Sequence, residues 1–381
     1  MKDLFERPSG FGAAVLVSVD FGEADYADSL HELEQLGLSA GLVLRGTLEG
    51  KRSTPDAKYF IGSGKAEELK LMMQATDAGV AVFNHDLTPS QQRNLERVLE
   101  ARVVDRTGII LDIFSQRAQT HEGKLQVELA QLEHLSTRLV RGWTHLERQK
   151  GGIGVRGGPG ETQLELDRRM LRVRVKQLRE KLDKLKQQRG MQRRARKRSN
   201  VMTVSLVGYT NAGKSTLFNR LTKADIYAAD QLFATLDTTS HKMYVPECGT
   251  VVLSDTVGFI KHLPHALVEA FGATLEEAAQ ADLLLHIVNT ASENRNEQIV
   301  QVNKVLHEIG ASEVPQILVH NQIDKLGLPS NVTRDEYGRI VAIHASAMTG
   351  EGMDLIRLAM AEHYQYLKRK STEESAYLEQ N

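Results

Sequence analysis

The chain has 381 residues, of which 41% are hydrophobic and 25% are charged, and its formal net charge is −1. This length exceeds what one ordinary hydrophobic core supports, so we expect two or three domains, and the composition is typical of a globular protein. The single cysteine, Cys248, excludes an intrachain disulfide framework and a thiolate metal cluster, and it fits a reducing compartment.

The most apolar early stretch, residues 13–19, has the length of a strand and is too short to cross a bilayer. We therefore expect a cytoplasmic protein without a membrane span. We also expect the protein to be a monomer. Peripheral contact with a membrane is left open.

The first 118 residues alternate short apolar segments with segments whose apolar residues recur at helical spacing. Alternation of this kind predicts an α/β domain with a mostly parallel sheet. A helix is expected to begin at Thr88-Pro89-Ser90-Gln91, because Thr88 suits the cap and Gln91 the capping-box position. The expected strands are 13–19, 41–48 and 80–83, the expected helices are 26–36 and 66–73, and 102–105 and 109–114 add strand or helix.

Residues 119–200 have the pattern of a helical hairpin. Apolar residues recur at helical spacing over 125–139 and again over 162–189, and the glycine-rich stretch 151–160 lies between them. This predicts an antiparallel coiled coil with the glycine loop at its tip.

The second predicted helix of this hairpin is strongly basic. A solvated face is the plain interpretation, but such an arm beside a glycine loop suits a polyanionic partner better. Trp143 is the one nearby aromatic candidate for base stacking, so contact with a phosphate backbone is expected rather than sequence reading. The basic residues are Arg168, Arg169, Arg172, Arg174, Lys176, Arg179, Lys181, Lys184, Lys186, Arg189, Arg193, Arg194, Arg196, Lys197 and Arg198.

A third domain is expected over 201–366, followed by a short, frayed polar tail over 367–381. An apolar strand at 201–207 leads into a GxxxxGK[ST] loop and then a helical segment at 217–221. Backbone amides of such a loop surround phosphates, Lys214 is expected to reach the β- and γ-phosphates, and Ser215 to bind Mg²⁺. The loop consists of Gly208, Tyr209, Thr210, Asn211, Ala212, Gly213, Lys214, Ser215 and Thr216.

Two further segments are expected to respond to the γ-phosphate. In Asp255-Thr256-Val257-Gly258, the carboxylate suits Mg²⁺ through a water molecule, and the Gly258 N–H suits the γ-phosphate. A threonine earlier in the chain closes onto Mg²⁺ in such proteins. Thr235 is the candidate within Phe233-Ala234-Thr235-Leu236-Asp237, and Thr238 and Thr239 are the alternatives.

The base specificity is predicted by Asn321-Gln322-Ile323-Asp324, which ends an apolar strand. The Asp324 carboxylate suits the two donors of guanine, and adenine would leave this acid unpaired. An ordinary turn is the alternative for an isolated motif of this kind. Ser346-Ala347-Met348, after a predicted strand at 340–344, resembles the loop whose backbone N–H meets guanine O6.

The motifs together predict a P-loop GTPase domain, with a mostly parallel sheet and helices on both faces, that hydrolyses GTP to GDP with Mg²⁺. Lys214, Thr235 and Gly258 are the expected catalytic residues. Phe259 follows Gly258 where some GTPases place a water-orienting glutamine, so we expect slow hydrolysis that a partner accelerates.

At this point the sequence resembles the HflX family of translational GTPases over nearly its whole length. The strings that carry the resemblance include GYTNAGKST, DTVGFIKHLP, IGSGKAEEL, FNHDLTPSQQRNLE and GPGETQLELDRR. The resemblance implies binding to the large ribosomal subunit and its rRNA through the basic hairpin and glycine loop, and splitting of stalled or stressed ribosomes. It also implies some ATP binding by the first domain. Nothing in the composition or the residue spacing indicates a second nucleotide site there.

Three features depart from that family pattern. Gln322 stands where GTPases usually have a lysine whose stem covers the guanine plane, so we expect guanine affinity to fall about tenfold. Gly157-Gly158 replaces an expected single glycine in the loop, and the C-terminal domain of many relatives is expected to be absent or vestigial.

Two other classes of function remain open at this stage. One is a GTP-regulated RNA-remodelling or RNA-modifying factor with an active site in the first domain, although His31, His85 and His121 are scattered there. The other is an RNA-binding adaptor that holds nucleotide without hydrolysing it.

Overall fold

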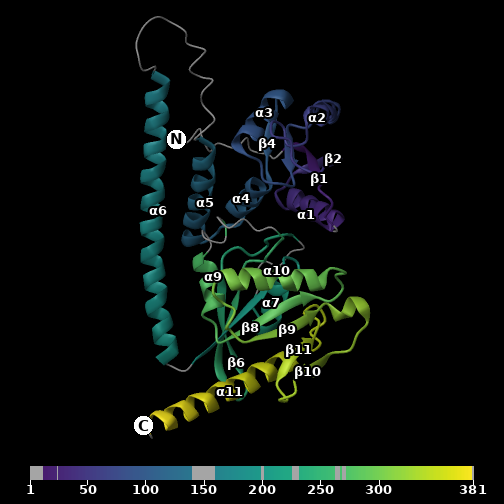
Figure 1. Ribbon diagram of the computed structural model, residues 1–381. Helices are drawn as coiled ribbons and strands as arrows, with labels where there is room; N and C mark the ends of the chain where they lie inside the picture. The colour runs from purple at the N-terminus through teal and green to yellow at the C-terminus, as the bar shows by residue number, and fades with distance from the viewer. Residues whose placement is uncertain are drawn as a thin grey trace, which may run out of the picture. The chain divides into compact units, whose positions relative to one another are not determined.

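The computed structural model describes residues 12–23, 25–139, 159–198, 201–224, 231–261, 267 and 272–379. The chain separates into two compact units, Met1–Leu182 and Asp183–Asn381, which are described separately (Figure 1). Helix α6 (Pro159–Arg198) contributes residues to both units. Among the described residues, no helix is long and apolar enough to cross a membrane.

The first unit contains a fully parallel sheet with strand order β2-β1-β3-β4. The predicted strand–helix alternation is confirmed, and the ambiguous segment after residue 101 forms a strand and then a helix. Its elements are β1 (Ala13–Asp20), α1 (Tyr26–Ser39), β2 (Val43–Lys51), α2 (Ser63–Thr76), β3 (Val80–Phe83), α3 (Pro89–Leu99), β4 (Arg102–Val104) and α4 (Arg106–Arg117).

The start of α3 has the predicted capping box. The Thr88 hydroxyl accepts the Gln91 N–H at 3.3 Å, and the Thr88 N–H donates to Gln91 Oε1 at 3.0 Å. The Gln91 side chain also donates to the carbonyl of Asp56 at 2.7 Å, which ties α3 to the loop between β2 and α2. Both ends of the sequence motif therefore satisfy free backbone groups of the helix.

Helix α5 (His121–Leu139) and the first part of α6 pack together in the same unit. Arg174 pairs with Glu128 and Arg179 with Glu133, and Leu178 is fully buried. The two predicted helices are therefore confirmed, each longer than expected. Trp143 and residues 151–158 of the glycine-rich stretch lie outside the described residues.

The second unit contains a seven-stranded sheet with the order β10-β11-β9-β8-β5-β7-β6. The five inner strands are parallel, and the edge strands β6 and β10 are antiparallel to their neighbours. The strands are β5 (Met202–Gly208), β6 (Thr239–Val245), β7 (Gly249–Asp255), β8 (Leu283–Asn289), β9 (Gln316–Asn321), β10 (Asn331–Arg334) and β11 (Ile340–His344).

Helices cover both faces of this sheet. Helices α7 (Lys214–Thr222) and α11 (Met353–Glu379) pack on the face that carries Leu283, Leu285 and Ile287 of β8. Helices α9 (Gly272–Ala279) and α10 (Arg295–Glu308) contact the central strands on the other face. Side chains alternate between faces along a strand, so β8 is buried on both sides, as expected for a central parallel strand.

The expected frayed tail is wrong for most of its length, because α11 continues to Glu379. The segment after residue 366 is rich in Lys, Arg, Glu and Leu and contains neither glycine nor proline. Such residues favour helix, so nothing in the sequence stops the helix at the end of its buried part.

Candidate functional site

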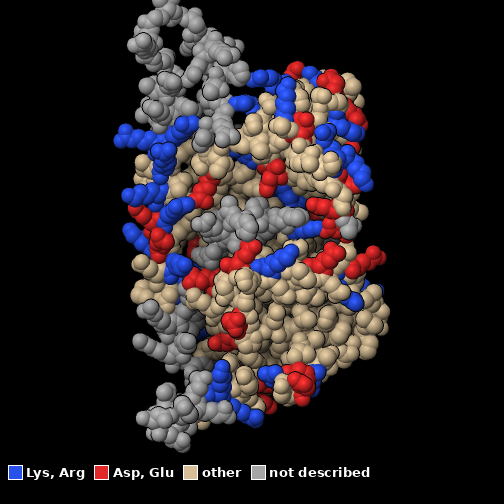
Figure 2. Space-filling model, in the orientation of Figure 1, with Lys and Arg blue, Asp and Glu red and all other residues tan. Residues whose placement is uncertain are grey.

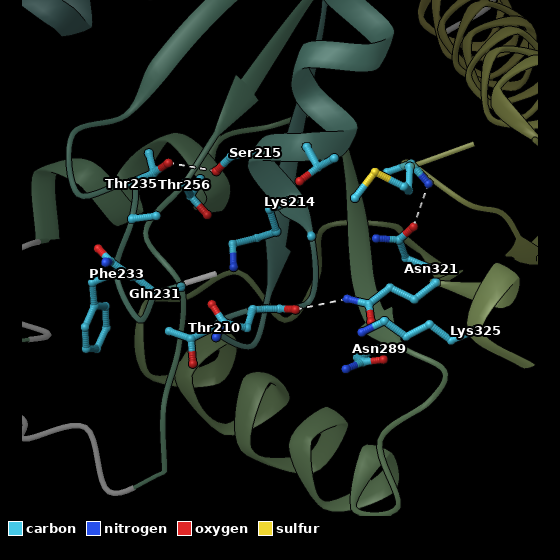
Figure 3. Close-up of a pocket in the computed structure, with 18 of the residues that line it drawn as sticks. Thr210, Lys214, Ser215, Gln231, Phe233, Thr235, Thr256, Asn289, Asn321 and Lys325 are labelled. Carbon is cyan, nitrogen blue, oxygen red and sulfur yellow. Dashed lines mark hydrogen bonds between the residues drawn. The ribbon is translucent and has the colours of Figure 1, made fainter. Parts of the chain in front are cut away.

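A pocket of about 380 Å³ opens at the carboxyl ends of the inner strands of the second unit (Figure 3). This is the edge at which parallel α/β sheets bind ligands, and the volume lies within the usual range for small-molecule sites. Its lining residues are Thr210, Asn211, Gly213, Lys214, Ser215, Thr216, Gln231, Phe233, Ala234, Thr235, Thr256, Gly258, Asn289, Asn321, Gln322, Asp324, Lys325, Ala347 and Met348.

The P-loop connects β5 to the first turn of α7. Gly213 precedes the helix with a φ of 91°, and a Cβ at this position would lie 2.3 Å from the Asn321 amide nitrogen. Only glycine fits both the left-handed backbone and this close approach. The loop thereby presents backbone amides and the positive end of the helix dipole to the pocket.

Lys214 is buried at the base of the pocket. Its ammonium donates to the carbonyls of Gly208 at 3.1 Å and Tyr209 at 2.8 Å. Burial lowers the pKa of Lys214 to about 8, and the nearby Asp255 carboxylate only partly opposes this shift. A cation that is poorly solvated in this way is a strong binding group for an incoming phosphate.

Three oxygen-bearing side chains meet beside Lys214. The Ser215 hydroxyl lies 2.7 Å from the Thr235 hydroxyl and donates to Asp255 Oδ2 at 2.6 Å. Burial raises the pKa of Asp255, whose other oxygen, Oδ1, has no hydrogen-bond partner among the described residues. Two hydroxyls and a carboxylate are hard oxygen ligands, so this donor set fits Mg²⁺ completed by phosphate and water.

The segment after Asp255 is bonded to the P-loop. The Thr210 N–H donates to the Phe259 carbonyl at 2.8 Å, and the Phe259 N–H donates to the Gly208 carbonyl at 3.2 Å. A Cβ on Gly258 would lie 2.7 Å from Thr210 Cγ2 and 3.1 Å from Lys214 Nζ. Glycine at 258 therefore allows this segment to approach the phosphate-binding loop closely.

Phe259 itself is fully buried and is not among the lining residues of the pocket. A phenyl ring has no hydrogen-bonding group. The side chain at this position therefore packs in the core and does not orient a water molecule.

The other end of the pocket is built by β9 and the loop after β11. Asn321 links two loops, because its amide donates to the Ala212 carbonyl at 2.8 Å and accepts the Ala347 N–H at 2.9 Å. The bond to Ala347 is drawn in Figure 3. The Ser346 hydroxyl donates to Asp324 Oδ1 at 2.5 Å. This hydrogen bond orients the carboxylate that was predicted to bind guanine.

Helix α7 also supports the loop after β11. The Arg220 guanidinium donates to the carbonyls of Ala347, at 3.2 Å, and of Met348. Arg220 was not predicted, since nothing in its sequence position links α7 to a loop more than 120 residues away.

Most of the predicted site residues line one pocket. Thr235 lines it, and its alternatives Thr238 and Thr239 do not. Three lining residues, Gln231, Asn289 and Lys325, were missed. Asn289 had a usable signal, because it is the polar end of an apolar strand at the edge where the P-loop lies. The predicted residues that do not line the pocket are Gly208, Tyr209, Ala212, Leu236, Asp237, Asp255, Val257, Ile323 and Ser346.

Matches to known protein families cover most of the chain. A family described as GTP-binding GTPase N-terminal matches residues 27–115, and GTP-binding GTPase Middle Region matches residues 117–196. A family described as 50S ribosome-binding GTPase matches residues 203–322.

Individual proteins are similar over comparable lengths. GTPase HflX of Escherichia coli K12 is 55% identical over 360 residues, which cover 94% of this chain and 84% of that protein. GTPase HflX of Magnetococcus marinus is 50% identical, over 85% of this chain and 75% of that protein. The crystal structure of an SsGBP and GDP complex is 23% identical with a TM-score of 0.52, covers 93% of this chain and 99% of its own, and shares the fold.

Proposed function

This chain belongs to the HflX family of GTPases, and we propose that it is a GTP-driven switch that binds the large ribosomal subunit and splits stalled or stressed ribosomes. The observation that carries the proposal is the pocket that joins the P-loop to a fixed carboxylate at its far end. The ribosomal partner is supported by the 50S ribosome-binding GTPase family that matches residues 203–322.

Guanine selection rests on Asp324. Its carboxylate is oriented by Ser346, and the buried amide of Asn321 couples the base end of the pocket to the P-loop. A guanine ring offers this acid two donors, whereas an adenine ring covers the carboxylate and leaves Oδ2, the oxygen not bonded to Ser346, without a donor, at a cost of about 1–3 kcal/mol.

Phosphate binding rests on Lys214 and the amides at the start of α7. We assign Mg²⁺ to the cluster of Ser215, Thr235 and Asp255, with Asp255 acting through water; when bound, the ion neutralises charge on the phosphates. Thr235 and Gly258 then report whether the γ-phosphate is present, because each belongs to a loop that lines the phosphate end.

Hydrolysis by the isolated protein is expected to be slow. Phe259 supplies no polar group, so the attacking water depends on backbone groups or on the ribosome for its position. Partner proteins accelerate related GTPases by about 10⁵-fold, which sets the scale of stimulation available.

The ribosome-binding surface is assigned to the basic arm. The Lys and Arg side chains gather along α6 at the left of the view in Figure 2, and several are exposed, among them Arg172, Lys181 and Lys184. Each such cation releases counterions when it meets an RNA phosphate, so binding should weaken steeply with salt. We assign the glycine-rich segment 151–160, of which residues 151–158 lie outside the described residues, to the same partner.

Sedimentation tests the proposal directly. Assembled ribosomes incubated with the protein and a non-hydrolysable GTP analogue should separate into subunits on a sucrose gradient, with the protein on the large subunit. The matched control is Asp324→Asn, which should lose the effect with the guanine analogue and regain it with the xanthine analogue. Ribosomes that stay intact under these conditions would contradict the splitting function.

Phosphate release separates the alternatives. Release that rises with large subunits supports the switch. Release stimulated by free RNA alone would favour an RNA-remodelling or RNA-modifying factor, and no release under any condition would favour a passive adaptor.

A further inference from the structure

Gln322 and Lys325 line the end of the pocket that is proposed to bind the guanine base. The position usually taken by a lysine carries the neutral Gln322, and a lysine follows three residues later. Both side chains line the same pocket. The structure indicates how the two share one task.

Gln322 keeps a mechanical link to the P-loop. Its amide nitrogen donates to the Asn211 carbonyl at 3.2 Å, and its backbone is left-handed with a φ of 67°. Holding a non-glycine residue in that conformation costs roughly 1 kcal/mol or more, so the surrounding structure constrains the backbone here, and the bond to Asn211 holds the side chain. The amide oxygen is buried and has no hydrogen-bond partner among the described residues.

Lys325 supplies the charge that Gln322 lacks. It lies in the short helix η3 (Ile323–Leu326), and its backbone N–H donates to the Gln322 carbonyl at 3.2 Å, which ties the two positions together. Figure 3 shows the Lys325 side chain extending from the end of β9 into the pocket. Within the described residues, no carboxylate pairs with its ammonium in a salt bridge.

The base needs a cover on its face as well as a partner at its edge. Asp324 is proposed to bind the edge of the guanine ring. An aliphatic lysine stem suits the face of that ring, because the stem shields the ring from water while the ammonium interacts with its π-system. The side chain of Gln322 is tied to Asn211 and is too short to offer both.

We propose that Lys325 is a specificity-determining residue: its stem covers a face of the bound guanine and its ammonium replaces the charge missing at position 322. The inference rests on the proposed guanine pocket. It replaces the expectation that Gln322 simply weakens binding, since the loss at one position is offset at another.

A double-mutant cycle tests the inference. Affinity for fluorescent GDP is measured for the unmodified protein, Lys325→Ala, Gln322→Lys and the double variant. Lys325→Ala should weaken binding about three- to tenfold, and the same change should cost less than about twofold once Gln322→Lys is present. Equal losses in both backgrounds, or no loss in either, would overturn the inference.

Two controls separate contact with the base from a general charge effect. Lys304→Ala removes an exposed lysine of α10 that does not line the pocket, and GDP affinity should be unchanged. In an Asp324→Asn background with XDP as ligand, Lys325→Ala should still weaken binding; disappearance of the loss would mean that Lys325 acts only on the Asp324 charge, against the inference.

The guanine pocket itself is checked in the same experiment. If the unmodified protein bound ADP in preference to GDP, the proposed function and this inference would both fail. If the unmodified protein bound GDP tightly and Lys325→Ala bound it with the same affinity, the guanine pocket would be supported and this inference alone would fail.

Discussion

The two sheets of this protein differ at the edge where the carboxyl ends of their parallel strands lie. In the second unit, the edge opens into the 380 Å³ pocket, and polar atoms such as Asp255 Oδ1 and Gln322 Oε1 lack partners among the described residues. In the first unit, the pocket found at the ends of β1 and β2 measures about 70 Å³, below the usual range for a small-molecule site.

Polar side chains at the first edge bond mainly to one another. The buried Arg106 pairs with Glu32 and donates to Asn84 Oδ1 at 2.8 Å, while the Asn84 amide donates to Ser18 and Ser29. The same architecture therefore gives a structural network in one unit and a binding site in the other. The two edges differ in how much open space they leave and in whether the polar groups beside that space satisfy each other.

The largest effect is expected from a substitution that disrupts the Arg106 network of the first unit. Arg106→Ala removes the guanidinium that pairs with the largely buried Glu32, so we expect the first unit to lose about 3–5 kcal/mol of stability. The measurement is a urea titration followed by circular dichroism, with saturating GDP to keep the second unit folded. GDP affinity should be unchanged, and a large fall in affinity would contradict the division of roles.

The corresponding change in the second unit should affect binding instead. Lys214→Ala removes the buried ammonium that we propose binds the phosphates through charge-assisted hydrogen bonds, so GTP affinity should fall about 100-fold, or about 3 kcal/mol. Isothermal titration calorimetry measures this loss, and the thermal stability of the nucleotide-free protein should not fall. A variant that binds GTP normally would show that the pocket is misassigned.

Acid should weaken the second unit through His286. Burial lowers the pKa of this fully enclosed histidine to about 4, below its ordinary 6.5, so the folded protein resists protonation that the unfolded chain accepts. Stability should therefore be present above pH 6.5 and be lost as pH falls toward 4, by about 2 kcal/mol between pH 7 and pH 5.

Unfolding measured across this pH range for the protein and for His286→Asn checks the expectation. The variant should show a shallower slope but not a flat one, since burial also lowers the pKa of His320 on the neighbouring strand β9. Identical slopes would exclude His286 as the source.

The smallest effect concerns alkaline pH. The pKa of Lys214 is about 8 in the nucleotide-free protein, and phosphate binds the protonated form. GDP affinity should be nearly constant below about pH 7 and fall about tenfold between pH 7 and pH 9 as the ammonium loses its proton. Affinity that stays level to pH 9.5 would indicate that the lysine remains charged in the empty pocket.

Sequence reasoning recovered the elements whose signals are local. The capping box at Thr88, the strand at 80–83 and the P-loop between β5 and α7 follow from residues a few positions apart. The fold class also followed, because strand–helix alternation permits few arrangements. The end of α11 did not, since a helix without a stop signal has no boundary in its own sequence.

The sequence by itself determined the order of the elements and the motifs that we propose bind phosphate and guanine, because each depends on spacing along the chain. Only the tertiary structure decided that Asn289, Lys325 and Arg220 support the same pocket, and that Phe259 faces the core. These relations join residues from strands and loops far apart in the chain, and side-chain direction there is set by packing and hydrogen bonding across the sheet edge.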